Sequence, residues 1–192
     1  SFERNHRVLA YDIKACGSAA RGIEVLEFAP NGFGLGKSIE DNRGLEALAI
    51  DEASTLFLGL ETNDGGSPVG LFGELGETGF NTRLPSPELT MLTGLDIVDD
   101  GAAPDRLYSI FRSYDPLRGN RIALAVTEVG DDGTLSETNQ FVIWGSSLLV
   151  DNFEGVAAMP LTSDTDRIVI VSNDNFSDRQ KTLLAVFDYA HQ

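Results

Sequence analysis

The sequence has 192 residues, and 42% of them are hydrophobic, which is enough apolar material for one globular domain with its own core. Its 30 acidic and 14 basic residues leave a formal net charge of −16, which argues against nucleic acid as a partner because Lys and Arg are needed to neutralise phosphates. The apolar runs are too short for a transmembrane segment. We therefore predict a single domain over residues 1–192.

Short apolar runs separated by turn-forming residues are typical of an all-β protein, and helical periodicity is almost absent. In chain order, strands are predicted at residues 7–13, 22–28, 45–50, 55–61, 69–75, 94–98, 106–112, 121–129, 139–144, 155–159, 167–172 and 182–188. Stretches such as "DDGAAPD", "DPLRGN" and "TSDTD" lie between them and are rich in turn formers.

A weak internal repeat organises these strands. The segments "RGLEALAIDEASTLFLGLE", "TGLDIVDDGAAPDRLYSIFR" and "EGVAAMPLTSDTDRIVIVS" each have a Gly, a short apolar strand, an acidic turn and a second strand. The aligned glycines are Gly44, Gly94 and Gly155. Repeated four-stranded units indicate a β-propeller, in which a glycine relieves crowding at the innermost strand of each blade. A sandwich also has many short strands but gives no reason for this glycine.

The strand count suggests an incomplete ring. Two strands precede residue 30, two units of four follow, and a last unit has three, or about thirteen strands in three to four blades. Propellers usually close with four to eight blades. We therefore expect the chain to be the C-terminal part of a larger propeller whose N-terminal blades are absent, with its last blade lacking a fourth strand.

Several motifs resemble the phytase-like family, described as having esterase-like activity of phytase. They are "SFERNHRVLAYD", "NRGLEALAID", "LTGLDIV", "FRSYDPLRGNRI" and, above all, "DNFEGVAAM" followed by "IVIVSNDNFSDRQKTLLAVFD". The resemblance implies a β-propeller and hydrolysis of esters or phosphoesters. It also implies an exported protein, periplasmic, extracellular or in the thylakoid lumen, although no signal peptide is visible in this sequence.

The acidic and amide residues near the repeat glycines are the candidate metal ligands. Calcium prefers carboxylate and carbonyl oxygens, and it can polarise an ester and activate a water molecule. The predicted ligands are Glu46, Asp96, Asn152, Glu154 and Asp174. The alternative is turn chemistry, in which these side chains accept hydrogen bonds from backbone amides. The overall acidity likewise suits either calcium recruitment or simple solubility.

Arginines supply the candidate substrate-binding groups. Arg4 and Arg7 lie in "ERNHR", and Arg112 and Arg118 lie in "FRSYDPLRGNR". Guanidinium groups can hold a phosphate or carboxylate through two parallel hydrogen bonds. The alternative is ordinary ion pairing with some of the many acids.

Serine and zinc hydrolase mechanisms are not expected. The stretches "GGSPVG" and "WGSSLL" lack the spacing of a Gly-x-Ser-x-Gly elbow, and one Cys with two His cannot form an ordinary zinc site. His6 is close to Arg4 and Arg7, which disfavour its protonated form, and His191 is expected to be frayed. Lone Cys16 has no predicted catalytic role.

Two functions therefore remain open. The first is a phytase-like or esterase-like hydrolase of small esters or phosphoesters, with calcium as the candidate cofactor. The second is a non-catalytic exported or lumenal propeller that binds protein partners or serves as a subunit of a larger assembly, such as a photosynthetic membrane complex. The absence of a recognisable nucleophile favours the second, and the family resemblance favours the first.

Overall fold

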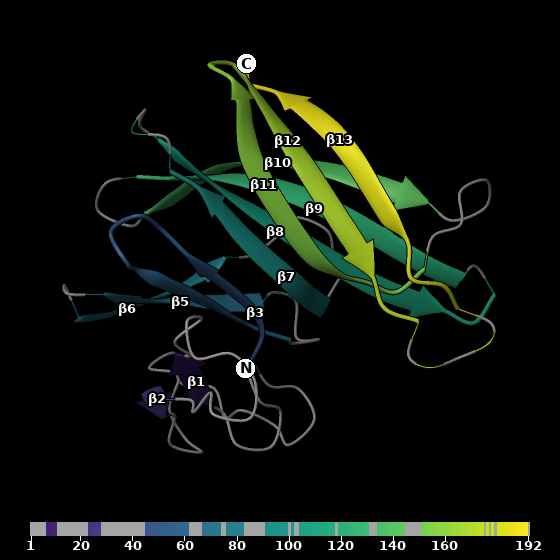
Figure 1. The fold of residues 1–192 in the computed structure, drawn as a ribbon, viewed down its shortest axis with the longest axis horizontal. Coiled ribbons are helices and arrows are strands. Elements are labelled where there is room, and N and C mark those ends of the chain that lie inside the picture. Colours follow the sequence, from purple (N-terminus) through teal and green to yellow (C-terminus); the bar gives the residue numbers. More distant parts are fainter. Residues whose placement is uncertain are drawn as a thin grey trace.

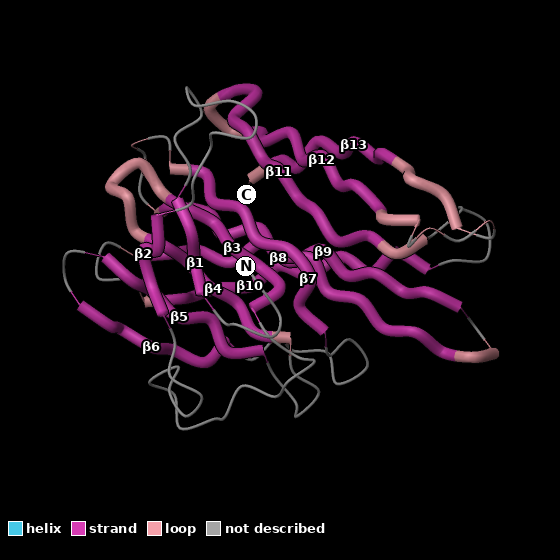
Figure 2. The backbone as a smooth tube through the Cα atoms, turned by 60° about the horizontal axis from the view of Figure 1, so that its bottom comes forward, coloured by secondary structure: helices cyan, strands magenta, loops and turns pink. Residues whose placement is uncertain are grey.

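The computed structural model describes residues 7–10, 23–27, 45–61, 67–73, 76–82, 91–99, 101, 104–117, 119–130, 134–144, 151–174, 176, 178 and 180–191. All regular structure within these ranges is β-strand, so the prediction of an all-β protein is confirmed (Figures 1 and 2). Within the same ranges, no helix is long and apolar enough to cross a membrane.

The strands form four antiparallel sheets in which each strand pairs with the next one along the chain. A two-stranded sheet contains β1 (Arg7–Ala10) and β2 (Ile23–Glu27). The first four-stranded sheet contains β3 (Leu45–Ile50), β4 (Leu56–Leu60), β5 (Ser67–Gly73) and β6 (Gly76–Thr82). The second, called the central sheet below, contains β7 (Met91–Val98), β8 (Asp105–Asp115), β9 (Gly119–Val129) and β10 (Leu135–Trp144). The terminal sheet contains β11 (Phe153–Thr162), β12 (Thr165–Ser172) and β13 (Leu184–Ala190).

The sheets pack beside one another as propeller blades do. The central sheet lies between the β3–β6 sheet and the terminal sheet (Figure 1). Its first strand, β7, contacts both β3 and β11, the first strands of its two neighbours. The fold is therefore propeller-like, as the repeat predicts, and the described strands divide into sheets of two, four, four and three, as counted from the sequence.

Burial follows this layering, because the central sheet is covered on both faces. Leu107 and Phe111 of β8 join a hydrophobic core shared with β3 and β4. Tyr108 and Ile110 point to the opposite face and join a second core shared with the terminal sheet. Alternate side chains of a strand point to opposite faces, so β8 and β9 are apolar on both.

Gly94 lies where two first strands approach closely. A Cβ atom at this position would be 3.0 Å from the carbonyl oxygen of Glu154 in β11. The hydroxyl of neighbouring Thr93 donates a hydrogen bond to the carbonyl oxygen of Phe153 at 3.1 Å. The predicted crowding at this glycine therefore exists, and the crowding group is the backbone of the next sheet. Gly155 is crowded by Val171 of its own sheet, and Gly44 lies outside the described residues.

Most strands differ from their predicted ranges by a few residues at one or both ends, and two further differences bear on the packing. β6 has no predicted range, because "GETGFNT" is mostly glycine and polar residues. β10 begins four residues earlier than predicted and contains a register shift between Ser136 and Thr138. This irregularity lets Leu135 face the core shared with β3 and β4, while Phe141 faces the terminal sheet.

Candidate functional site

The face of β8 that meets the terminal sheet carries an arginine at each end of an apolar stretch. Arg106, Tyr108, Ile110 and Arg112 are alternate residues and so share this face. Arg106 contacts Asp166 of β12, whereas Arg112 contacts Glu154 of β11. The interface between the two sheets therefore has one charged cluster at each end.

The Arg112 cluster comprises Glu61, Arg112, Asn152, Glu154 and Asn173. Arg112 Nη1 lies 3.5 Å from Glu154 Oε1, and Nη2 lies 3.9 Å from Glu61 Oε1. Glu61 directly follows β4, so the cluster brings together groups from three sheets. The Arg112 and Glu154 side chains are 28% and 35% exposed, whereas Glu61 is 12% exposed. These ion contacts are long, and the Arg112 and Glu154 side chains are partly exposed to solvent. Both of these charged groups are therefore accessible to a small molecule.

Two amide side chains fix the position of the Glu154 carboxylate. Buried Asn152 donates from Nδ2 to Glu154 Oε1, and Asn173 Nδ2 donates to Oε2 at 3.2 Å. The backbone amide of Asn173 also donates to the carbonyl oxygen of Asn152 at 2.8 Å, which joins the start of β11 to the end of β12. The "DNFEG" and "SNDNF" motifs therefore meet in space. The sequence did not single out Glu61 or Asn173 as site residues.

The aspartates of the same two motifs cap loops. Asp151 accepts hydrogen bonds from the backbone amides of Asn152 and Lys181 and from the Gln180 side chain. Asp174 Oδ1 accepts a hydrogen bond from the backbone amide of Phe176 at 3.0 Å. Phe176 has a φ of 55°, an uncommon conformation outside glycine that this turn supports. For Asp174, the observed contact is thus the turn chemistry weighed in the sequence analysis.

The other two predicted ligands lie on first strands. Asp96 Oδ2 of β7 accepts a hydrogen bond from the backbone amide of Ala158 in β11 at 2.6 Å. Burial raises the pKa of Asp96, and hydrogen bonds from the Ala158 and Ile97 amides partly oppose this rise. The side chain of Glu46 is half-buried on β3 and interacts with another group of the protein. The carboxylate of Asp96 therefore links β7 to β11 at a position four residues beyond Glu154.

Only one predicted substrate-binding arginine can be placed fully. Arg112 lies in the cluster described above. Arg7 begins β1, but its side chain is outside the described part of the chain, and Arg4 and Arg118 are outside it entirely.

Comparison with known families identifies the lineage of this chain. The phytase-like family, described as esterase-like activity of phytase, matches residues 1–176, which include every residue of the Arg112 cluster. The chain belongs to the phytase-like family. A search of curated proteins gives no match.

The contacts around Glu154 in this phytase-like chain do not suit a calcium ion. Its carboxylate oxygens face a guanidinium and two amide NH₂ groups, all of which are hydrogen-bond donors and not metal ligands. Among the described residues, no group of three or more His, Cys, Asp or Glu side chains is arranged to hold a metal ion. Calcium dependence therefore stays a prediction, without support from these contacts.

The opposite end of the interface holds a cluster that the sequence analysis missed, here called the Asp166 cluster: Arg106, Tyr108, Asp166 and His191. Asp166 is fully buried and accepts hydrogen bonds from Arg106 Nε at 2.7 Å and from the Tyr108 hydroxyl. His191 Nε2 lies 3.0 Å from the same carboxylate, and the backbone amide of His191 donates to Asp164. The expectation that His191 is frayed is therefore wrong.

Hydrogen bonding decides the charge state of Asp166. Burial acts to raise its pKa, but the hydrogen bonds from Arg106 and Tyr108 and the charge of Arg106 outweigh burial, so the pKa lies below its ordinary value. Burial, together with the adjacent Asp166, raises the pKa of Tyr108. One signal in the sequence pointed to this cluster. Asp166, Ile168 and Ile170 are alternate residues of β12, so the carboxylate faces the same core as the two isoleucines.

Proposed function

We propose that this phytase-like chain hydrolyses small esters or phosphoesters at the Arg112 cluster. The observation that supports this proposal most strongly is the partly exposed pair of Arg112 and Glu154, which spans two sheets and whose carboxylate is held by the Asn152 and Asn173 amides. The family's description as esterase-like agrees with the reaction class.

The two charged groups have complementary roles in this reaction. Glu154 accepts a proton from a water molecule as the water oxygen attacks the ester carbon or phosphorus. Arg112 stabilises the negative charge that develops on the substrate oxygen. The bond to the leaving alcohol then breaks, and the alkoxide regains a proton from Glu154. Asn152 and Asn173 orient the carboxylate throughout, since both donate to it.

The charge of the cluster predicts which substrates are preferred. Two carboxylates and one guanidinium leave it one negative charge in excess, in a chain whose net charge is −16. A neutral ester approaches such a site without electrostatic repulsion, whereas a doubly charged phosphate monoester is repelled. We therefore expect p-nitrophenyl acetate to be hydrolysed faster than p-nitrophenyl phosphate.

Substitution of the pair tests the proposal. Glu154→Gln removes the base but keeps the shape, and we expect kcat/KM for p-nitrophenyl acetate to fall about 100-fold. Arg112→Met should have an effect of about the same size, because it removes the stabilising donor. Arg167→Met is the matched control, since Arg167 forms an exposed ion pair with Asp188 on the terminal sheet. Activity unchanged in Glu154→Gln would contradict the proposal.

The same assay tests calcium dependence. Activity is measured after chelation with EDTA and again after calcium is added back. Loss and recovery of activity would support the sequence-based prediction, whereas full activity in EDTA would show that the reaction proceeds without the ion. The activity of Glu154→Gln is measured in both solutions, with EDTA and with added calcium, so that the role of the carboxylate is tested separately from that of the ion.

A second candidate function is supported by the outer face of the terminal sheet. Apolar residues on this face are exposed: Met159, Leu161, Val171, Leu184 and Val186. Such a patch is typical of a surface that contacts another protein. A non-catalytic binding module or subunit would show no hydrolysis of any ester tested and would form a stable complex through this face.

A further inference from the structure

Two exposed aromatic side chains lie just beyond the Arg112 cluster in the chain, one on each of the two sheets that form the Arg112–Glu154 pair. Tyr114 is two residues beyond Arg112 on β8, and Phe176 is three residues beyond Asn173 in the loop after β12. Tyr114 is 67% exposed, and Phe176 is fully exposed. Core packing therefore accounts for neither ring.

The strand directions place both aromatic residues at the same end of the interface. β8 runs from the Asp166 cluster to the Arg112 cluster. β12 runs the same way, and its last residue, Ser172, pairs with Phe153, the neighbour of Glu154. The tip of the β8–β9 hairpin and the loop after β12 therefore both continue past the Arg112 cluster at this end.

The β8–β9 hairpin holds Tyr114 in a defined position. Tyr114 pairs with Asn120 of β9 near the end of the ladder. The side chain of Asp115 closes the turn by accepting a hydrogen bond from the backbone amide of Leu117 at 2.7 Å. Because alternate residues of a strand face the same way, Tyr114 lies on the face of β8 that carries Arg112. Its ring is therefore on the side of the terminal sheet, next to the arginine.

The loop after β12 holds Phe176 in a backbone conformation that a bulky residue rarely adopts. Its φ is 55°, and Asp174 supports this turn by accepting a hydrogen bond from the Phe176 amide at 3.0 Å. The far end of the loop is tied to the start of β11, because Asp151 accepts a hydrogen bond from the Lys181 amide at 2.7 Å. Such conformations persist where the surroundings enforce them, and they are concentrated at ligand-binding and active sites. Backbone preference thus explains a phenylalanine here no better than core packing does.

We propose that Tyr114 and Phe176 bind the aromatic group of an aryl ester whose carbonyl group lies at Arg112. This inference rests on the hydrolysis proposed above and names its substrate class. The carbonyl oxygen accepts a hydrogen bond from Arg112, and the attacked carbon faces the water molecule beside Glu154. The aryl group of the leaving alcohol extends outward to the two exposed rings. Contact between aromatic rings is favourable, and it removes apolar surface from water on both sides.

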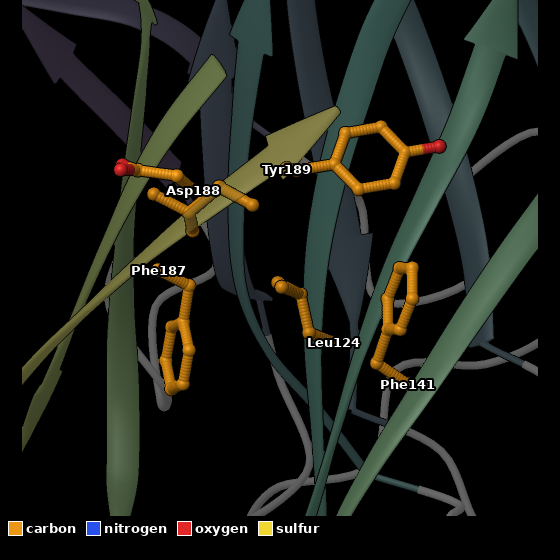
Figure 3. Close-up of a pocket in the computed structure, with 6 residues that line it drawn as sticks. Leu124, Phe141, Phe187, Asp188 and Tyr189 are labelled. Atoms are coloured by element: carbon orange, nitrogen blue, oxygen red, sulfur yellow. The ribbon is translucent and has the colours of Figure 1, made fainter. Parts of the chain in front are cut away.

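A separate apolar space between the same two sheets is the competing site for an aromatic ligand. Its volume is about 200 Å³, and it is lined by Leu124, Phe141, Ile168, Phe187, Asp188 and Tyr189. In Figure 3, Leu124, Phe141 and Phe187 surround this space. None of these lining residues belongs to the Arg112 cluster, so a small ligand in this space lies away from Arg112. Phe141 is 44% exposed and so provides a matched aromatic control.

Binding of two small amides tests the proposal without any turnover. Acetanilide keeps the carbonyl and phenyl groups of an aryl ester, whereas N-methylacetamide has a methyl group in place of the phenyl ring. The Kd of each is measured with the intact chain by nuclear magnetic resonance titration. We expect acetanilide to bind at least about tenfold more tightly, because only its ring reaches Tyr114 and Phe176. Equal affinities for the two amides would contradict the proposal.

Substitution of the rings locates the binding site. Phe176→Asn removes the ring but suits the loop, because Asn tolerates a positive φ, whereas Phe176→Tyr keeps the ring. We expect acetanilide to bind about threefold or more weakly in Phe176→Asn and within about twofold of wild type in Phe176→Tyr. KM for p-nitrophenyl acetate should rise in Phe176→Asn with little change in kcat, because the ring binds substrate and transition state alike. Tyr114→Thr should weaken binding in the same way, and Phe141→Ala should not.

The outcomes separate this proposal from the proposed reaction. Binding that is lost in Phe141→Ala but not in Phe176→Asn would place the ligand in the space of Figure 3 and overturn the aryl site. Undiminished binding in both Phe176→Asn and Tyr114→Thr would overturn it as well. If acetanilide binds through these rings but no ester is hydrolysed, the aryl site is supported and the proposed reaction fails. If hydrolysis depends on Glu154 but on neither ring, the reaction is supported and the aryl site fails.

Discussion

Arg106 and Arg112 lie on the same face of β8, contact the same neighbouring sheet and each pair with a carboxylate, yet their surroundings differ. Arg106 and Asp166 are buried, and Tyr108 also donates to the Asp166 carboxylate. Arg112 and Glu154 are half exposed, lie 3.5 Å apart and are partly shared with Glu61. Arg112 Nε is buried and has no hydrogen-bond partner within the described residues.

We interpret this difference as one between a structural ion pair and the pair that is proposed above to act in hydrolysis. A buried carboxylate whose hydrogen bonds are all internal cannot reach a substrate, but it fixes how the two sheets pack. A half-exposed pair adds little stability and keeps charges available at the surface. We infer that the Asp166 end aligns the sheets and the Arg112 end carries the chemistry.

The largest expected effect is the loss of Asp166. Asp166→Ala leaves buried Arg106 and Tyr108 without their shared partner, and breaking a buried ion pair in this way costs about 3–5 kcal/mol of unfolding free energy. Glu154→Ala, at the half-exposed end, should cost less than about 1 kcal/mol. Urea unfolding followed by circular dichroism measures both. Equal losses in the two variants would contradict the distinction between the two ends.

An intermediate effect is expected where the first strands approach. Gly94→Ala places a methyl group 3.0 Å from the Glu154 carbonyl oxygen, which is backbone and cannot rotate away. Overpacking of this kind typically costs about 1–3 kcal/mol. Because the displaced residue is Glu154, ester hydrolysis should fall as well. Thr93→Ser, which keeps the hydroxyl bonded to Phe153, is the matched control. A Gly94→Ala variant with wild-type stability would show that β11 moves freely at this point.

A smaller effect on stability is expected at acidic pH. The folded pKa of Asp166 lies below its unfolded value of about 3.9, so its contribution to stability is present above that value and is lost as the pH falls through the folded pKa. The unfolding free energy, measured by urea titration at a series of pH values below about 4, should therefore fall as the pH is lowered. The fall should be smaller in Asp166→Asn, because this variant has no carboxylate to protonate at this position. Identical acid profiles for wild type and Asp166→Asn would rule out this linkage.

The sequence predicted much of the fold because burial in strands leaves a local pattern. Leu45–Ile50 was located to the residue, since its apolar alternation matches one buried face. Gly94 was identified from the repeat, although only the structure shows that the Glu154 backbone crowds it. β6 escaped prediction because its glycines and polar residues give no apolar pattern, and its place depends on pairing with β5.

The site was less predictable because its contacts join distant residues. Glu154 and Asn152 stand out in a local motif, but Glu61 reaches the cluster only through the packing of a different sheet. Likewise, 60 residues separate Arg106 from Asp166. Acidic and amide residues beside a repeat glycine suggested calcium near Glu154, whereas the three-dimensional contacts place hydrogen-bond donors around it. The partners that surround a carboxylate are decided by the folded arrangement of residues far apart in the sequence.

The most direct test of the division between the two ends is nuclear magnetic resonance of the arginine Nε–H groups, assigned with Arg106→Lys and Arg112→Lys. The chain is titrated with acetanilide, an uncharged amide analogue of the neutral phenyl esters that are proposed as the preferred substrates. We predict that the Arg112 signal shifts progressively while the Arg106 signal stays in place and exchanges slowly with water. An unmoved Arg112 signal, or a shift confined to Arg106, would contradict the account.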